Sequence, residues 1–285
     1  MESSPGMRYS WYMMLVWIKG AGDLASGIAY RLVKANFRVI MTELPEPAAV
    51  RRAVCFSEAV RLGSAEVEGV RAVRAETAEE AETLLKEGVI PVIPDASGRI
   101  ARTMSPDVLV DAVMAKRNTG TRIGDAETVI GIGPGFTAGT DCHAVVETKR
   151  GHTLGRAIYE GSAILDTGVP GVIGGYGAER VFRSPAAGIF FPEKEIGDVV
   201  QKGDVIARVG DVPVTAAIGG MIRGMLPPGF PVREHMKAGD IDPRGSSVDF
   251  RLISDKSLAV GGGVLEAVLH CRGTRGSSDI IRNTD

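Results

Sequence analysis

The sequence predicts an α/β protein in which an N-terminal parallel sheet is followed by a mostly-β region. Between residues 15 and 122, short apolar runs alternate with segments of helical periodicity, which is typical of parallel strands joined by helical crossovers. From residue 181 onward, short strand-like runs and glycine-rich turns replace the helical period. The predicted divisions are residues 1–125, a glycine-rich connecting β region at 126–177, a β domain at 178–244, and a C-terminal helix and polar tail at 245–285.

Composition excludes several classes of function. The 33 basic residues nearly balance the 35 acidic ones, so nothing attracts the chain to nucleic acid or to an anionic membrane. The three cysteines form no CxxC pair, and the four histidines show no metal-ligand spacing, so we expect a cytoplasmic protein without a metal site. The apolar run at residues 11–18 is too short to span a bilayer, and we interpret it as the first buried strand.

The periodic segments define the expected elements. We expect strands at residues 15–18, 39–42, 89–93, 108–113, 128–132 and 144–148, and helices at 24–34, 48–53 and 77–86. A closing helix is expected at residues 258–269, where three consecutive glycines would allow close packing against another element. The polar residues after Cys271 are expected to be disordered.

The first apolar run leads into the pattern Gly20-x-Gly22-x-x-Ala25, which is typical of a Rossmann-like nucleotide-binding turn. Gly20 permits a tight turn, Gly22 lets a phosphate approach the backbone, and Ala25 lets helix and strand pack closely. Glu43 ends the second expected strand, where a carboxylate binds ribose hydroxyls. The alternative is a turn of the same shape that binds no nucleotide.

Three charged residues near this turn leave their roles open. Asp23 would repel a phosphate, but it could also cap the helix, point away, or hold a ligand hydroxyl. Arg51 and Arg52 could bind a phosphate or carboxylate, or could be solvated charges on a helix.

A second glycine-rich loop follows the expected strand at 128–132. Backbone N–H groups around Gly133 and Gly135 could form an anion-binding nest, to which the Thr137 and Thr140 hydroxyls would add donors. The alternative is an irregular connection whose glycines adopt positive φ.

The strongest candidates for acid–base chemistry follow this loop. His143 and Glu147 fall on one face of the expected strand at 144–148 and could act as a base and its orienting acid, and Lys149 is a further candidate. The alternative is a structural histidine near a turn. Cys142 has no activating partner in the sequence and is interpreted as a bystander.

The β region contains a degenerate repeat. Residues 184–189 are echoed by 216–221, and the Gly-Asp turns at 197–204 are echoed more loosely by 229–240. This pattern resembles the barrel-sandwich hybrid of biotinyl and lipoyl domains. The hairpin between the two halves, at residues 208–213, contains no lysine, and Lys202 and Lys237 lie elsewhere. We therefore expect no biotin or lipoate and interpret the sandwich as a structural or docking module.

Five stretches together resemble one family: residues 18–27, 130–139, 147–156, 238–244 and 253–256. They are similar to YqeB-type proteins of the selenium-dependent molybdenum hydroxylase system. The resemblance implies an accessory factor in the maturation of molybdenum hydroxylases, with the hydroxylase apoenzyme or other maturation factors as partners. It supplies no catalytic residues.

The resemblance and the glycine turn together suggest that the ligand is a molybdopterin cofactor or its dinucleotide. Two alternatives stay open. One is an NAD-dependent oxidoreductase that uses His143 or Lys149 as acid or base, and the other is a non-enzymatic docking scaffold. Whether the chain is an enzyme, and whether it forms a homo-oligomer, is not determined by the sequence.

Overall fold

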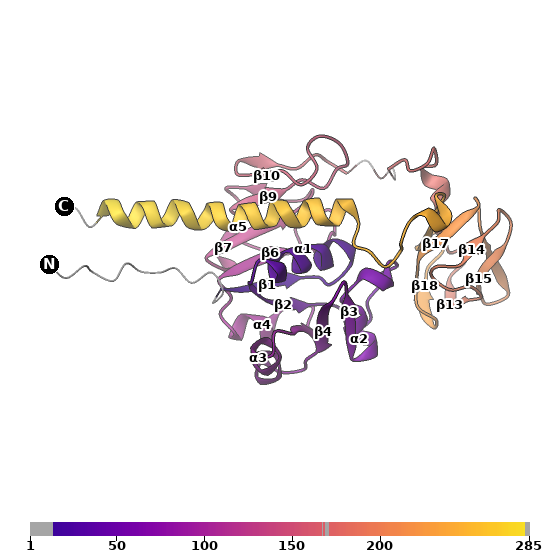
Figure 1. Cartoon of the computed structure of the whole chain (residues 1–285), viewed down its shortest axis with the longest axis horizontal. Helices are drawn as coiled ribbons and strands as arrows, with labels where there is room; N and C mark the ends of the chain where they lie inside the picture. Colours follow the sequence, from indigo (N-terminus) through magenta and orange to yellow (C-terminus); the bar gives the residue numbers. More distant parts are fainter. Residues whose placement is uncertain (1–13, 167, 169–170, 283–285) are drawn as a thin grey trace.

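The computed structural model describes residues 14–166, 168 and 171–282. Residues 11–13 of the first apolar run lie outside this description. Figure 1 shows a large sheet flanked by helices, a small β domain beyond one end of it, and a long C-terminal helix along one side.

The large sheet has nine strands in the order β10-β9-β7-β6-β1-β2-β5-β4-β3. The strands from β9 to β4 run parallel, and β10 and β3 pair antiparallel at the two edges. Their bounds are β1 Leu15–Lys19, β2 Arg38–Thr42, β3 Ser64–Val67, β4 Val70–Arg74, β5 Ile90–Ile93, β6 Val108–Asp111, β7 Thr128–Ile132, β9 Ala144–Val146 and β10 Ala157–Ile158. Two further strands, β8 (Thr137–Ala138) and β11 (Gly161–Ser162), pair with each other.

The strand order has a switch point between β1 and β6. The chain passes from β1 to β2 on one side and later places β6 on the other side of β1. In open α/β sheets, ligands bind in the crevice at the carboxyl ends of two such strands. The predicted boundary at residue 125 is corrected by this sheet, because β7 and β9 extend it beyond β6.

Helices cover both faces of the sheet, which explains the nearly continuous apolar runs of its strands. On one face, α1 (Asp23–Lys34), α2 (Glu58–Leu62) and α5 (Asp255–Arg282) pack on residues such as Val16 and Ile18. On the other face, α3 (Ala78–Lys86) and α4 (Arg99–Thr103) pack near Leu15 and Trp17.

Helices α1 and α5 touch backbone to backbone. A Cβ added to Gly27 would lie 2.6 Å from Ser257 Cβ, and one added to Gly261 would lie 2.7 Å from the Gly27 carbonyl oxygen. Gly263 packs just as closely on the Gly155 carbonyl oxygen. The prediction that the glycines of the closing helix permit close packing is confirmed for Gly261 and Gly263 but not for Gly262, which meets no atom within 4 Å.

Two sequence predictions about helices are wrong. The expected disordered tail after Cys271 is helical to Arg282, because α5 continues past the edge of the sheet with its own backbone hydrogen bonds (Figure 1). The expected helix at 48–53 is a short 3₁₀ turn, η2 (Arg52–Val54), because the Val50 carbonyl oxygen instead accepts the Met225 N–H of the β domain. The β3–β4 hairpin was not expected.

The β domain consists of two four-stranded sheets, β12-β19-β17-β14 and β16-β15-β13-β18. Its strands are β12 Val181–Arg183, β13 Gly188–Pro192, β14 Val199–Val200, β15 Val205–Val209, β16 Val212–Thr215, β17 Gly220–Met225, β18 Phe230–Val232 and β19 Lys237–Asp242. The two sheets have equivalent strand orders, in which β12, β19, β17 and β14 correspond to β16, β15, β13 and β18. The two copies of the sequence repeat, residues 184–189 and 216–221, lead into the equivalent strands β13 and β17. Gly188 (φ 157°) and Gly220 (φ 149°) open these equivalent strands. Phe190, Ile206, Ile222 and Ile241 fill the core between the sheets.

Candidate functional site

A cavity of about 640 Å³ opens at the switch point of the large sheet. It is bounded by the carboxyl ends of β1, β2 and β6, the start of α1, and the loops that follow β5 and β6. Its wall includes Lys19, Gly20, Gly22, Asp23, Ala25, Thr42, Glu43, Leu44, Ala48, Ala49, Ser97, Arg102, Val113, Met114, Thr119 and Gly120.

The two glycines of the first turn have different roles. Gly20 has φ +95°, and an added Cβ would lie 3.0 Å from the Ala112 carbonyl oxygen, so this residue sets the turn. Gly22 has φ −74°, which any residue can adopt, and an added Cβ would meet no atom within 4 Å. Gly22 therefore leaves open space in the wall of the cavity. Ala25 is buried against the sheet, as the motif predicts.

Glu43 closes the turn at the end of β2. Its two carboxylate oxygens accept the backbone N–H groups of Ala21 at 2.8 Å and Leu44 at 2.7 Å. A carboxylate has about four acceptor positions, so each oxygen can still accept a ligand hydroxyl. The side chain is fixed at the wall of the cavity before any ligand binds.

The charge of Asp23 is balanced at the edge of the cavity. One carboxylate oxygen accepts the Ser257 hydroxyl at 2.8 Å, and the other lies 3.4 Å from Nη1 of the buried Arg51. The interaction with Arg51 reduces the repulsion that Asp23 would exert on a phosphate at Gly22.

A buried charged cluster that sequence reasoning missed joins β1 to β6. Lys19 Nζ donates to Asp111 Oδ2 at 3.0 Å and to Thr121 Oγ1 at 2.6 Å, and the Thr121 hydroxyl donates to Asp111 Oδ2 at 2.5 Å. Asp111 is 2% exposed. The sequence contained a sign of this cluster, because Lys19 and Asp111 are charged residues at the ends of two apolar runs, and both runs form parallel strands.

The loop after β6 carries backbone strain beside this cluster. Met114 (φ 60°) and Lys116 (φ 61°) adopt the left-handed conformation that non-glycine residues rarely take. Such conformations concentrate at functional sites. Met114 lies in the cavity wall, so this loop belongs to the site.

The second glycine loop does not form the open anion-binding nest proposed from sequence. The Thr137 N–H donates to Asp141 at 2.9 Å, the Gly139 N–H donates to Cys142 O, and the Thr140 N–H donates to Thr137 O. The Gly133 N–H donates to Val146 O, and a Cβ on Gly135 would lie 2.5 Å from Arg117 Cα. The Thr137 hydroxyl bonds to Ser162. Because these donors already have acceptors within the protein, the loop corresponds to the alternative of an irregular connection.

The proposed pairing of His143 with Glu147 is not formed. The two residues flank β9 at opposite ends, and His143 Nδ1 accepts the Val129 N–H at 3.0 Å. The Glu147 carboxylate accepts the backbone N–H groups of Thr148, Lys149 and Ile164 at 2.7–2.8 Å. This carboxylate anchors loops rather than orienting a base.

Neither Lys149 nor Cys142 supplies an alternative reactive group. The Lys149 side chain is exposed, and it does not line the cavity. Burial raises the pKa of the Cys142 thiol to about 11, so its thiolate is scarce at neutral pH.

The described part of the chain contains neither a metal-binding cluster nor a membrane-spanning helix. Within it, no three His, Cys, Asp or Glu side chains gather in a way that could hold a metal ion. Nor is any helix in that part both long enough and apolar enough to cross a membrane.

Comparison with known proteins identifies one curated relative. No family model matches the chain. Over 255 residues, or 90% of its length, the chain is 50% identical to the uncharacterized protein YqeB of Escherichia coli K12. Over this stretch the chain is similar to YqeB. It spans 47% of YqeB, about half of that protein.

Solved structures give only distant likenesses. The ectoine utilization protein EutE (DoeB) of Ruegeria pomeroyi is 12% identical with a TM-score of 0.23, covering 79% of this chain and 56% of that one. An aspartoacylase family protein of Mesorhizobium loti is 10% identical with a TM-score of 0.24, covering 80% of this chain and 84% of that one. Scores this low carry no argument about fold or function.

Proposed function

We propose that the cavity at the β1–β6 switch point binds the nucleotide part of an anionic cofactor. The observation that carries this proposal is the open space at Gly22, at the start of α1 and in the wall of a preformed cavity. A helix N-terminus favours a negatively charged group there, and a glycine lets it approach the backbone.

The other wall residues fit the remaining parts of a nucleotide. Glu43 accepts ribose hydroxyls, and the apolar side chains of Leu44, Ala48 and Ala49 provide a surface for a base. The ammonium group of Lys19 makes two hydrogen bonds within the protein and has a third proton for a phosphate oxygen. The cavity volume of about 640 Å³ lies within the roughly 300–1,000 Å³ typical of ligand sites.

The resemblance of the sequence to YqeB-type proteins suggests which cofactor this is. We propose a molybdopterin dinucleotide, held in the cytoplasm while it is modified or transferred to a molybdenum hydroxylase. The β domain, as a barrel-sandwich hybrid, would then serve as the docking module for the hydroxylase. The alternative of an NAD-dependent oxidoreductase has less support, because His143 and Lys149 lie outside the cavity wall.

The test is a Gly22→Val variant examined by titration calorimetry with a molybdopterin dinucleotide and, separately, with NAD. We expect wild type to bind the dinucleotide and the variant to lose binding while keeping its circular dichroism spectrum, because the valine side chain fills the phosphate position. Gly124→Val is the matched control, since Gly124 also has open space around an added Cβ but lies outside the cavity.

Three outcomes separate the hypotheses. Saturable binding of NAD alone would favour the oxidoreductase. Binding of neither ligand by wild type would favour the docking scaffold. A Gly22→Val variant that binds as tightly as wild type would show that the ligand does not cross this turn.

A further inference from the structure

A second cavity lies between the large-sheet domain and the β domain. It has a volume of about 500 Å³. Its wall combines the segment before η2, the loop between β9 and β10, strands β17 and β19, and the chain that leads into α5. The charged residues in this wall include Arg51, Arg150, Arg223, Asp242, Arg244 and Asp255. We call this cavity the arginine cleft. Its residues come from both domains, so the cleft exists only because the domains pack together.

Three of the arginines around the cleft are neutralised by neighbouring carboxylates. Arg223 pairs with Asp240, and Arg244 pairs with Asp242 at 2.8 Å. Arg150 forms a two-pronged contact with Asp255, at 2.8 and 3.2 Å.

Two further arginines are buried with much weaker compensation: Arg51 in the wall of the cleft, and Arg180 next to that wall. Arg51 is 6% exposed, and its contacts are long: 3.4 Å to Asp23, 3.4 Å to Phe250 O and 3.2 Å to Leu252 O. Arg180 is 5% exposed and donates to Gly171 O at 3.0 Å. Among the residues that the structure describes, no carboxylate lies within ion-pair distance of Arg180.

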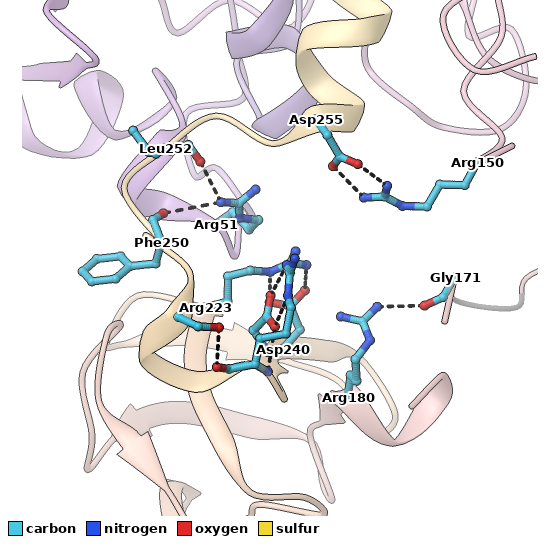
Figure 2. A network of polar contacts seen from close by, with 12 residues as sticks. Arg51, Arg150, Gly171, Arg180, Arg223, Asp240, Phe250, Leu252 and Asp255 are labelled. Atoms are coloured by element: carbon cyan, nitrogen blue, oxygen red, sulfur yellow. Dashed lines mark hydrogen bonds and ion pairs between the residues drawn. The ribbon is translucent and has the colours of Figure 1, made fainter. Parts of the chain in front are cut away.

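Several guanidinium donors in this region have no acceptor. Within the described chain, Nε of Arg51 and both Nε and Nη1 of Arg180 are buried without a hydrogen-bond partner. Figure 2 shows Arg51, Arg150 and Arg180 arranged around a common space, with Arg223 and Asp240 at its edge. A buried charge with unmet donors is unfavourable in the unliganded protein, so an anion from outside would satisfy it.

The electrostatic environment of Arg180 agrees with this geometry. Burial lowers the pKa of Arg180, and the positive charges of Arg223 and Arg150 lower it further, against the opposing effect of Asp240 and Asp242. The fold therefore holds positive charges close together at this point.

We propose that the arginine cleft binds an oxyanion, specifically the phosphate group of a small molecule. Planar guanidinium groups bind phosphate oxygens through paired hydrogen bonds, and here the donors are already fixed in position. Because Arg51 belongs to the large-sheet domain and Arg180 precedes β12, the bound phosphate fastens the two domains together.

The phosphate has two potential sources. It belongs either to a free phosphate-bearing molecule or to the far end of a ligand that also occupies the switch-point cavity. Asp23 links the two sites, because it lines the cavity and contacts Arg51 of the cleft.

The test uses the full chain, with pyrophosphate as the probe and acetate as the comparison anion. We expect pyrophosphate to raise the melting temperature and to bind saturably in titration calorimetry. Arg180→Met should bind at least about tenfold more weakly, because it removes charge-assisted hydrogen bonds. Without anion, the same variant should melt higher than wild type, by about 2–4 °C, because a buried uncompensated charge is gone.

Two further variants distinguish this role from a structural one. Arg180→Lys keeps the charge but loses the unmet donors, so it should weaken binding without raising the melting temperature of the anion-free protein. Arg183→Met is the matched control, because Arg183 is exposed and donates to His235 O. It should behave like wild type in both measurements.

Competition separates the sources of the phosphate. If a dinucleotide bound in the switch-point cavity displaces pyrophosphate, one ligand spans both sites; if both bind together, the cleft takes a separate molecule. Gly22→Val should keep pyrophosphate binding, so the two proposals can fail independently. Absence of saturable pyrophosphate binding, or an Arg180→Met variant that melts lower than wild type and binds normally, would overturn the arginine cleft as an oxyanion site.

Discussion

The switch-point cavity and the region of the arginine cleft hold buried charge in opposite ways. At the switch point, Lys19 is matched by Asp111 and Thr121, with each contact at 3.0 Å or less. Beside the arginine cleft, Arg180 has no matching carboxylate among the described residues and retains two unmet donors. The first arrangement stabilises the unliganded protein, and the second is complete only when an anion binds. Removing the Asp111 charge and removing the Arg180 charge should therefore have opposite effects on stability.

The largest effect is expected at the switch point. Asp111→Asn keeps the shape of the side chain but leaves the Lys19 ammonium buried without a counterion. Breaking a buried ion pair on one side lowers the free energy of unfolding by about 3–5 kcal/mol. Urea denaturation of wild type and variant measures this loss.

The exposed pair between Lys116 and Asp166 provides the control for that measurement. These side chains are 58% and 39% exposed, so Lys116→Gln should change the free energy of unfolding by less than about 1 kcal/mol. If Asp111→Asn were no more destabilising than Lys116→Gln, the charges at the switch point would not differ from surface charges, and the contrast with Arg180 would disappear.

An intermediate effect is expected where α1 and α5 touch. Gly27→Ala would place a methyl group 2.6 Å from Ser257 Cβ and displace the residue that donates to Asp23 at the border of the two cavities. Overpacking of this kind destabilises by about 1–3 kcal/mol. Thermal unfolding followed by circular dichroism gives the size of the change.

Gly262→Ala is the matched control on the same pair of helices. An added Cβ at Gly262 meets no atom within 4 Å, so alanine should stabilise α5 by up to about 1 kcal/mol. Equal destabilisation by Gly27→Ala and Gly262→Ala would show that helix propensity, and not the contact with Ser257, governs this helix pair.

The smallest expected effect is a loss of stability at acid pH, caused by protonation of Asp240 beside the arginine cleft. Burial acts to raise the pKa of Asp240, but the hydrogen bond from Arg223 and the charges of Arg223, Lys237 and Arg51 together lower it below its ordinary value of 3.8. A carboxyl group whose pKa is lower in the folded state stabilises the fold fully at pH values above its unfolded-state pKa. This stabilisation is lost as the pH falls through the folded-state pKa. Each unit of depression corresponds to about 1.4 kcal/mol.

Arg223→Gln isolates this contribution. The stability difference between wild type and Arg223→Gln, measured by denaturation at a series of pH values, should be constant above about pH 5 and should narrow below about pH 4. A difference that stays the same down to about pH 2 would mean that Arg223 does not depress the pKa of Asp240.

Short-range features were predictable from the residues themselves. The turn at Gly20, the open position at Gly22 and the place of Glu43 follow from one strand, one helix and the next strand, so their geometry is fixed within a few residues of chain. The β repeat was also visible, because equivalent strands begin with similar residues at Gly188 and Gly220. These features need only local backbone rules.

Predictions that depended on partners distant in sequence were less successful. His143 and Glu147 share a strand face in sequence, but their side chains bond to backbone groups supplied by other segments. Residues 48–53 have the composition of a helix, yet Val50 contacts Met225 across the domain boundary. In each case a tertiary hydrogen bond replaced the interaction that local pattern suggested.

The parallel sheet and its glycine turn can be predicted from the residues alone, because the alternation of apolar runs and helical periodicity is a local pattern. Which charges meet depends instead on tertiary packing. Lys19 and Asp111 are 92 residues apart, and Arg51 meets Phe250 across 199 residues. No local pattern encodes such distances. These long-range contacts form when the helices and the β domain pack. A charge that is buried in this way needs either a partner of opposite charge in the protein or a bound anion.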